Sequence, residues 1–151
     1  MDTTSAQAML REDRAEWEAL CAALDAHPDG PLHDPEAPEW TARDVYTHLA
    51  RMMESTTALT EAIVAGQPST DFEPFDEFDG TDEDVVNERI QRKYSHMSLD
   101  EARAWAQRAF ERRVRAIESV PPDRWDAQLD EIARGDGGEH YRGHRSYIVV
   151  V

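Results

Sequence analysis

Several features are scarce in this 151-residue sequence, and each scarcity excludes a class of protein. The single cysteine, Cys21, rules out a disulfide within the chain and fits a reducing compartment. No apolar run approaches the roughly 18 residues of a membrane-spanning helix. The N-terminal segment also lacks the basic start and apolar stretch of a secretory signal. We therefore expect a cytoplasmic protein.

Basic side chains are few as well, with 16 Lys and Arg against 32 Asp and Glu, so the net charge is -16. Proteins that bind nucleic acid usually carry a basic face that displaces counterions, and an acidic surface is repelled by anionic membranes. We expect neither nucleic acid nor a membrane as a partner. A neutral or cationic small molecule, or a metal ion, is more compatible with this charge, which otherwise serves solubility.

The residues that are present favour a single all-α domain over residues 1–151. Hydrophobic residues make up 40% of the chain and charged residues 32%, a balance typical of globular proteins. Apolar residues recur at three- and four-residue steps, which predicts amphipathic helices beginning near residues 4, 41, 81, 98 and 136. Residues 123–134 are predicted to be partly helical, and the only candidate strand is the apolar segment 148–151. These elements predict a four-helix bundle.

A long crossover is predicted between the second and third helices, over residues 67–80. This segment is acidic, contains three phenylalanines and has no clear helical or strand period. A lid that covers one end of the bundle is one interpretation. A calcium loop is the other, but the regular ligand spacing of an EF-hand is absent.

Local signals place the helix ends and the inward faces. Thr41 with Asp44, and Ser98 with Glu101, have the spacing of capping boxes, and Asp136 is expected to cap the final helix with Glu139 near its third position. Along the second helix the predicted inward positions are Val45, Leu49, Met52, Leu59 and Ile63. Cys21 falls between Leu20 and Leu24 on the inward stripe of the first helix, which indicates a core residue rather than a reactive thiol.

Histidine spacing raises the possibility of a metal site. His140 and His144 are four residues apart in the predicted final helix, so both imidazoles share one face. His48 lies between Val45 and Met52 and is expected to face the core. Imidazole is a good ligand for Zn²⁺, Ni²⁺ and Fe²⁺. The alternatives are an exposed pair on a terminal helix and a satisfied buried histidine. His27, His33 and His96 are expected on the surface.

Two motifs resemble the DinB-like superfamily. The segment WTARDVYTHLA, residues 40–50, is similar to the superfamily signature W-[ST]-x-[RK]-D-[VL]-x-x-H-[LI]-A, and HYRGH, residues 140–144, resembles its closing motif. The resemblance implies a four-helix bundle that holds a divalent metal through His48, His140 and His144. The superfamily includes mycothiol- and bacillithiol-dependent transferases and isomerases and YfiT-like hydrolases. A homodimer is an assembly often found in it.

A narrower resemblance covers the middle of the chain as well. The segments NERI, residues 87–90, and SLDEA, residues 98–102, together with the HYRGH ending, are similar to the colibactin self-protection branch. Its namesake opens an electrophilic cyclopropane by hydrolysis. The last three residues, all valine, depart from the usual polar or Trp-Leu ending of these proteins.

The chemistry expected of such a site is attack on an electrophilic small molecule. A bound ion would lower the pKa of water or of a low-molecular-weight thiol, and without metal the histidines could act as general bases. Tyr141 and Glu139 are candidates for transferring a proton or orienting a ligand, although both neighbours of His140 on a helix point about 100° away from it. Asp44 could orient His48, although capping is the favoured role.

Three hypotheses for function follow from these residues. The leading one is an enzyme that detoxifies or transforms a reactive molecule by hydrolysis or by thiol transfer. The second is a non-catalytic bundle that sequesters a small molecule. The third is a bundle that dimerises through an exposed helix face and carries its histidines incidentally.

Overall fold

The computed structural model describes residues 3–67, 75–78 and 82–148. Within these described residues, six α-helices follow one another: α1 (Thr3–Asp25), α2 (Ala42–Val64), α3 (Glu83–Lys93), α4 (Leu99–Glu118), α5 (Ala127–Arg134) and α6 (Gly138–Arg145). Two short 3-10 helices, η1 (Asp76–Phe78) and η2 (Pro122–Arg124), lie in the connections. The described residues contain no strand, and the predicted strand segment beyond residue 148 lies outside them.

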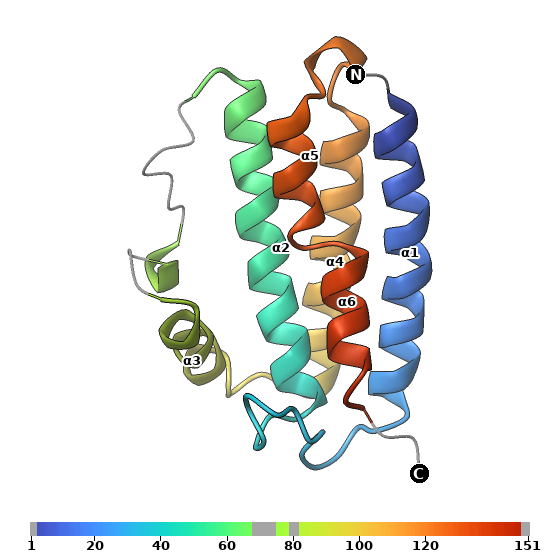
Figure 1. Cartoon of the computed structure of the whole chain (residues 1–151). Helices are drawn as coiled ribbons and strands as arrows, with labels where there is room; N and C mark the ends of the chain where they lie inside the picture. The colour runs from blue at the N-terminus through green and yellow to red at the C-terminus, as the bar shows by residue number, and fades with distance from the viewer. Residues whose placement is uncertain (1–2, 68–74, 79–81, 149–151) are drawn as a thin grey trace.

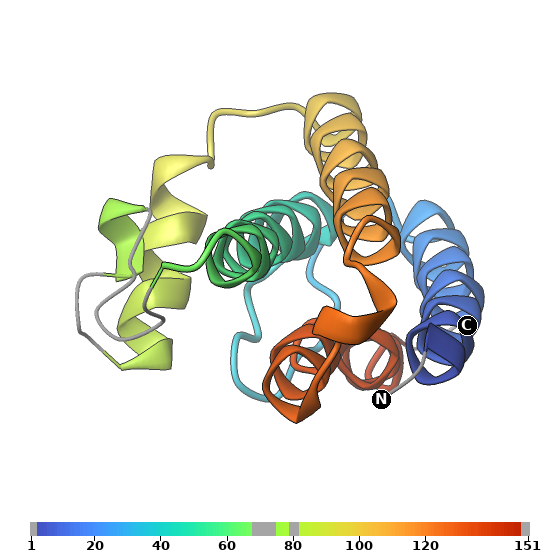
Figure 2. The same ribbon diagram turned by 90° about the horizontal axis from the view of Figure 1, so that it is seen from above.

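Three long helices and two short ones form the bundle. In Figure 1, α1, α2 and α4 stand side by side, while α5 and α6 follow each other along the fourth edge. Helix α2 packs against α4, α6 packs against α1, and α5 packs against α2. Seen from above in Figure 2, α3 lies outside the bundle and covers the outer face of α2. The predicted all-α bundle with a long crossover after the second helix is confirmed.

The fourth edge of the bundle consists of two helices, α5 and α6, rather than one. Side chains from α1 and α4 occupy the gap between them. Arg113 donates to Asp13 Oδ2 at 2.6 Å and to the carbonyl of Ala133 at 2.7 Å. Both charged side chains are 2% exposed. A Cβ on Gly137 would lie 2.6 Å from Asp13 Oδ1, so the chain passes this buried ion pair only with glycine at that position. The sequence placed the break, with a partly helical segment at residues 123–134 and a final helix beginning near residue 136, but it did not show the buried ion pair that fills the gap.

Aromatic rings fill the middle of the core. The ring of Trp17 from α1 stacks on Phe110 from α4, with centroids 5.1 Å apart, and meets Tyr141 from α6 edge-on at 5.2 Å. Aliphatic side chains from α1 and α2 surround these rings, among them Leu20, Leu24, Leu49 and Met53. Cys21 packs against this cluster, and burial raises the pKa of its thiol to about 11, which agrees with the predicted structural role.

The predicted inward face of α2 is correct at its N-terminal end and shifted further along. Val45 and Leu49 are fully buried, but the buried methionine is Met53 rather than Met52. Leu59 and Ile63 are half-buried, and Thr57 and Thr60 take the buried positions nearby. Thr57 and Thr60 face α4 and α5, beside Arg113, Ala116 and Ala133, while α3 covers a different face of α2.

Two of the three predicted caps are confirmed. Thr41 with Asp44 and Ser98 with Glu101 both form capping boxes. The prediction for Asp136 is wrong, because the N-cap residue of α6 is Gly137 and has no side chain to bond. Asp13 of α1 takes over instead, with its Oδ1 accepting from the backbone N–H of Gly138 at 2.7 Å. Among the described helices, none combines the length and the apolar character that spanning a bilayer requires.

Candidate metal centre

Two helices bring the three predicted histidines together. His48 lies on α2, about two turns from the N-terminus, and is 3% exposed. His140 and His144 are one turn apart on α6, the helix that Asp13 fixes at its start. The ring of His48 is 5.4 Å from the ring of His140 and 5.2 Å from that of His144, centroid to centroid. The predicted convergence of the three side chains is therefore present.

The same nitrogen of each ring points to the centre of the cluster. His140 Nε2 is 3.4 Å from His48 Nε2 and 3.0 Å from His144 Nε2. Metal-ligating atoms from all three rings lie within 4.8 Å of one another. Imidazole nitrogens about 2.1 Å from one ion stand about 3.0 Å apart at a right angle and about 3.4 Å apart at the tetrahedral angle. Both Nε2 separations from His140 fit a shared divalent ion.

The outward nitrogens of the two α6 histidines face polar groups. His140 Nδ1 lies 3.3 Å from Asp136 Oδ1, at ion-pair distance, although the ring N–H is not aligned well enough for a hydrogen bond. His144 Nδ1 lies 2.5 Å from the hydroxyl of Tyr147. A carboxylate can accept only, so it favours the tautomer with a proton on Nδ1 and a free lone pair on Nε2.

The outward nitrogen of His48 faces the third helix. Its Nδ1 is buried without a hydrogen-bond partner among the described residues, and so is Oδ1 of Asn87 on α3. The amide of Asn87 lies close enough to His48 to oppose the lowering of its pKa. On the other side, the ring of Trp40 is 5.4 Å from that of His48. His48 is thus enclosed between α3 and the segment before α2.

Burial keeps two of the histidines uncharged at neutral pH. Burial first, and then the charges of His144 and His140, hold the pKa of His48 well below its ordinary value of 6.5. Burial and the charge of His140 lower the pKa of His144 to about 3. Neutral imidazole is the form that binds metal. The neutral rings of His48 and His144 therefore suit a cation, and the residues fit the metal that the sequence predicted.

Tyr141 lies on another face of α6, in the aromatic core. It is fully buried, and its hydroxyl donates to Met53 Sδ at 3.2 Å. Burial raises the pKa of this phenol, so it stays protonated. This environment is that of a packing residue, and the predicted role in proton transfer stays a prediction. Glu139 is exposed on the other side of His140.

The other predicted side chains have structural partners. Asp44 accepts from the backbone N–H of Thr41 at 3.0 Å, as the capping interpretation predicts. His33 and His96 are exposed as expected, whereas His27 is half-buried.

Sequence reasoning missed the residues behind the histidines: Thr56, Asn87, Asp136 and Tyr147. For two of them, the spacing in the sequence from a predicted ligand could have indicated that they lie beside it. Asp136 is four residues before His140 and Tyr147 is three after His144, which are helical-neighbour spacings. Asn87 and Thr56 could be found only from the structure, because their positions depend on how α2, α3 and α6 pack.

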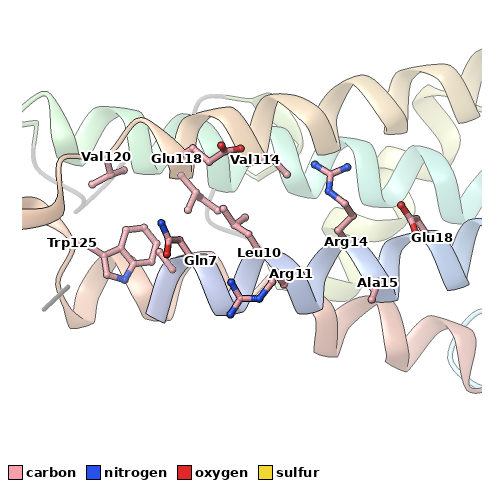
Figure 3. Close-up of a pocket in the computed structure, with 12 residues that line it drawn as sticks. Gln7, Leu10, Arg11, Arg14, Ala15, Glu18, Val114, Glu118, Val120 and Trp125 are labelled. Carbon is pink, nitrogen blue, oxygen red and sulfur yellow. The ribbon is translucent and has the colours of Figure 1, made fainter. Parts of the chain in front are cut away.

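A separate groove runs between α1 and α4, away from the histidines. Its apolar floor includes Leu10, Val114, Val120 and Trp125, and charged side chains such as Arg11, Arg14 and Glu118 stand at its rim. Figure 3 shows these side chains lining the space between the two helices. None of the three histidines lines this groove.

Comparison with known proteins places the chain in a family. Residues 4–141 match the mycothiol maleylpyruvate isomerase N-terminal domain, and the match includes His48 and His140. No curated protein and no solved structure matches the chain significantly. The narrower resemblance to the colibactin self-protection branch stays a prediction. Because the match spans most of the sequence, the chain belongs to the mycothiol maleylpyruvate isomerase N-terminal domain family, a DinB-like family.

Proposed function

We propose that this protein is a metal-dependent enzyme that transfers a low-molecular-weight thiol to an electrophilic small molecule. The observation that carries the proposal is the convergence of His48, His140 and His144: the Nε2 atoms of His48 and His144 lie 3.4 Å and 3.0 Å from His140 Nε2, and ligand atoms of all three lie within 4.8 Å of one another. Three protein ligands leave a further coordination position open, which is the arrangement of catalytic rather than structural metal sites.

A divalent ion held there would lower the pKa of a thiol bound at the open position and so supply a nucleophile near neutral pH. The three imidazoles are neutral ligands and leave the charge of the ion uncompensated, which favours an anionic fourth ligand such as a thiolate. Trp40 and Asn87 enclose His48, whereas His140 keeps 22% of its side chain exposed. The open approach to the site is therefore beside His140.

The expected reaction is the addition of the thiol to the electrophile. With an epoxide as electrophile, a sulfur–carbon bond forms, the carbon–oxygen bond of the ring breaks, and the proton lost by the thiol ends on the oxygen. Membership of a family named for mycothiol supports thiol transfer. Hydrolysis, which the colibactin-branch resemblance implies, would use water in the same position. Sequestration without turnover is the non-enzymatic alternative.

The test is turnover of a small epoxide by untagged protein loaded with Zn²⁺, Ni²⁺ or Fe²⁺, with and without mycothiol. We expect product only when thiol and metal are both present. His48→Ala should reduce kcat/KM by at least about 100-fold, beyond the loss usual for residues that merely orient a ligand. His96→Ala is the matched control, since His96 is exposed elsewhere, and it should leave the rate unchanged.

Other outcomes of that assay would replace the proposal. Ring opening by water alone, at the same rate with and without thiol, would make the protein a hydrolase. Tight binding of the epoxide without any product would support sequestration. Equal activity of wild type and His48→Ala would remove the histidine cluster from the chemistry altogether.

A further inference from the structure

We propose that Asp136 is a positioning residue that holds His140 in the tautomer able to accept a metal ion. The inference rests on the proposed function, because it assigns a task to a residue behind the metal centre. It concerns the proton on the imidazole, however, and can be tested without any turnover. The sequence suggested a different task for Asp136, the capping of the final helix, which Gly137 and Asp13 perform without it.

Asp136 is well placed for this task. Its side chain is 10% exposed, and its Oδ1 lies 3.3 Å from His140 Nδ1. Its second oxygen, Oδ2, accepts a hydrogen bond from the hydroxyl of Thr56 on α2. Thr56 also lies 3.1 Å from the carbonyl of Met52, and its single proton can serve only one of the two acceptors at a time. The carboxylate is therefore held between two helices, with one oxygen left for the imidazole.

Arg113 interacts electrostatically with Asp136 but makes its hydrogen bonds to other groups. Its guanidinium hydrogen-bonds go to Asp13 and to the carbonyl of Ala133. Oδ1 of Asp136 thus remains available to His140, and a small rotation of the ring or the carboxylate would align the N–H with it.

The tautomer matters because His140 stands between the other two histidines. Its Nε2 is 3.0 Å from His144 Nε2 and 3.4 Å from His48 Nε2. With the proton on Nε2, His140 would donate to His144 and close the cluster as a hydrogen-bonded pair. With the proton on Nδ1, directed at Asp136, the Nε2 lone pair faces the centre and can bind a cation. Asp136 decides between these two forms.

The experiment compares wild type with Asp136→Ala, and with Thr56→Ser as a matched control that retains the hydroxyl. The tautomer of His140 is read from ¹⁵N chemical shifts of the metal-free full-length protein at about pH 8, where an ordinary histidine is neutral. Zn²⁺ affinity is measured in parallel by competition with a chromogenic chelator. Circular dichroism confirms that each variant is folded.

We expect wild type and Thr56→Ser to carry the proton of His140 on Nδ1, and Asp136→Ala to carry it mainly on Nε2. The Zn²⁺ affinity of Asp136→Ala should fall by about 10- to 100-fold, the loss usual for residues that orient a ligating histidine. An unchanged tautomer in Asp136→Ala, or the Nε2–H form already in wild type, would overturn the inference. If wild type binds no Zn²⁺, the proposed function fails, but the tautomer of the metal-free protein still decides the role of Asp136.

Discussion

At the residue scale, each histidine of α6 directs its Nε2 toward the centre of the histidine cluster and its Nδ1 toward a polar group behind it. His140 is supported by Asp136 and His144 by Tyr147. Burial, followed by the nearby charge of Asp34, raises the pKa of Tyr147, so its hydroxyl stays protonated. If that proton is directed to the carboxylate of Asp34, the phenol oxygen accepts from His144 Nδ1 and leaves Nε2 free for an ion.

Removing one hydroxyl tests this support. Tyr147→Phe retains the ring, which packs against the core, and removes only the group 2.5 Å from His144 Nδ1. We expect the Zn²⁺ affinity to fall by about 10-fold, measured by chelator competition. Tyr46→Phe is the matched control, because it removes a hydroxyl that donates to Asp25 instead. Equal affinities for the two variants would show that Tyr147 does not support the site.

At this scale, the sequence could predict which histidines share a helix face, but not which neighbouring side chains also face the site. His48, His140 and His144 followed from spacing on two helices and from the superfamily motifs. Tyr141 next to His140 was a candidate by proximity in sequence, yet its side chain enters the aromatic core beside Trp17. Which neighbour of a ligand faces the site depends on the rotation of α6 against α1, which spacing alone does not determine.

At the element scale, the interruption between α5 and α6 is built around the buried Asp13–Arg113 pair. Asp13 bonds both Arg113 and the start of α6, and Arg113 bonds the carbonyl of Ala133 in α5. The ion pair thus fixes where α6 begins, and with it the height of His140 and His144. The helices themselves could be predicted from periodicity and caps. The sequence also placed their junction, but it could not show what fills it, because that depends on a contact between segments 125 residues apart.

Alanine substitutions at two glycines test this junction. A Cβ at Gly137 would lie 2.6 Å from Asp13 Oδ1, so Gly137→Ala should lower the free energy of unfolding by about 1–3 kcal/mol, as overpacking usually does. Gly143 lies within α6, and a Cβ added there would meet no atom within 4 Å. Gly143→Ala should therefore raise stability by about 0.5–1 kcal/mol. Urea unfolding measures both, and a stable Gly137→Ala would contradict the tight junction.

A second set of elements is joined by the buried carboxylate of Glu77 in η1. Its Oε1 contacts Arg51 of α2 at 3.2 Å, Lys93 of α3 at 3.2 Å and the hydroxyl of Tyr94 at 3.1 Å. The guanidinium of Arg51 lies 3.9 Å from the centre of the Phe75 ring. These contacts attach the described part of the crossover to the outer face of α2.

The stability that Glu77 contributes should depend on pH. Burial opposes its ionisation, but a backbone hydrogen bond, Arg51, Lys93 and Tyr94 outweigh burial and lower its pKa from 4.5. A carboxyl with a lowered pKa in the folded state stabilises the fold above its unfolded pKa and loses that contribution as pH falls through its folded value. The difference in unfolding free energy between wild type and Glu77→Gln should therefore be largest near neutral pH and shrink below 4.5.

An exposed carboxylate supplies the control for that series. Glu118 on α4 is exposed, so Glu118→Gln should change stability by no more than about 0.5 kcal/mol at any pH. Urea unfolding at stepped pH values measures both variants. A difference between wild type and Glu77→Gln that stays constant on acidification would show that the charge of Glu77 does not stabilise the attachment.

At the scale of the whole molecule, a bound ion would join α2 to α6, whose histidines His48 and His140 lie 92 residues apart in the sequence. The bundle and its family were predictable because the motif around His48 and the closing motif resemble one superfamily, and the fold agrees with that resemblance. The position of α3 against the outer face of α2 was not predictable, since it depends on tertiary packing.

A ligand that binds only the folded chain stabilises it by mass action, by about 2.7 kcal/mol at a concentration 100 times Kd. Zn²⁺ or Ni²⁺ should therefore raise the Tm of wild type in a concentration-dependent way, measured by differential scanning calorimetry. His140→Ala should show no such shift, while His33→Ala, at an exposed loop position, should respond like wild type. A similar rise in Tm for His140→Ala would point to binding elsewhere.

The central claim is that His48, His140 and His144 hold one divalent ion. The most direct measurement is elemental analysis of untagged wild type beside His144→Ala, after incubation with Zn²⁺, Ni²⁺ or Fe²⁺ and removal of the excess. We predict about one ion per chain in wild type, the stoichiometry of a single three-histidine site, and none in the variant. Absence of metal from wild type, or equal metal in both proteins, would contradict the claim.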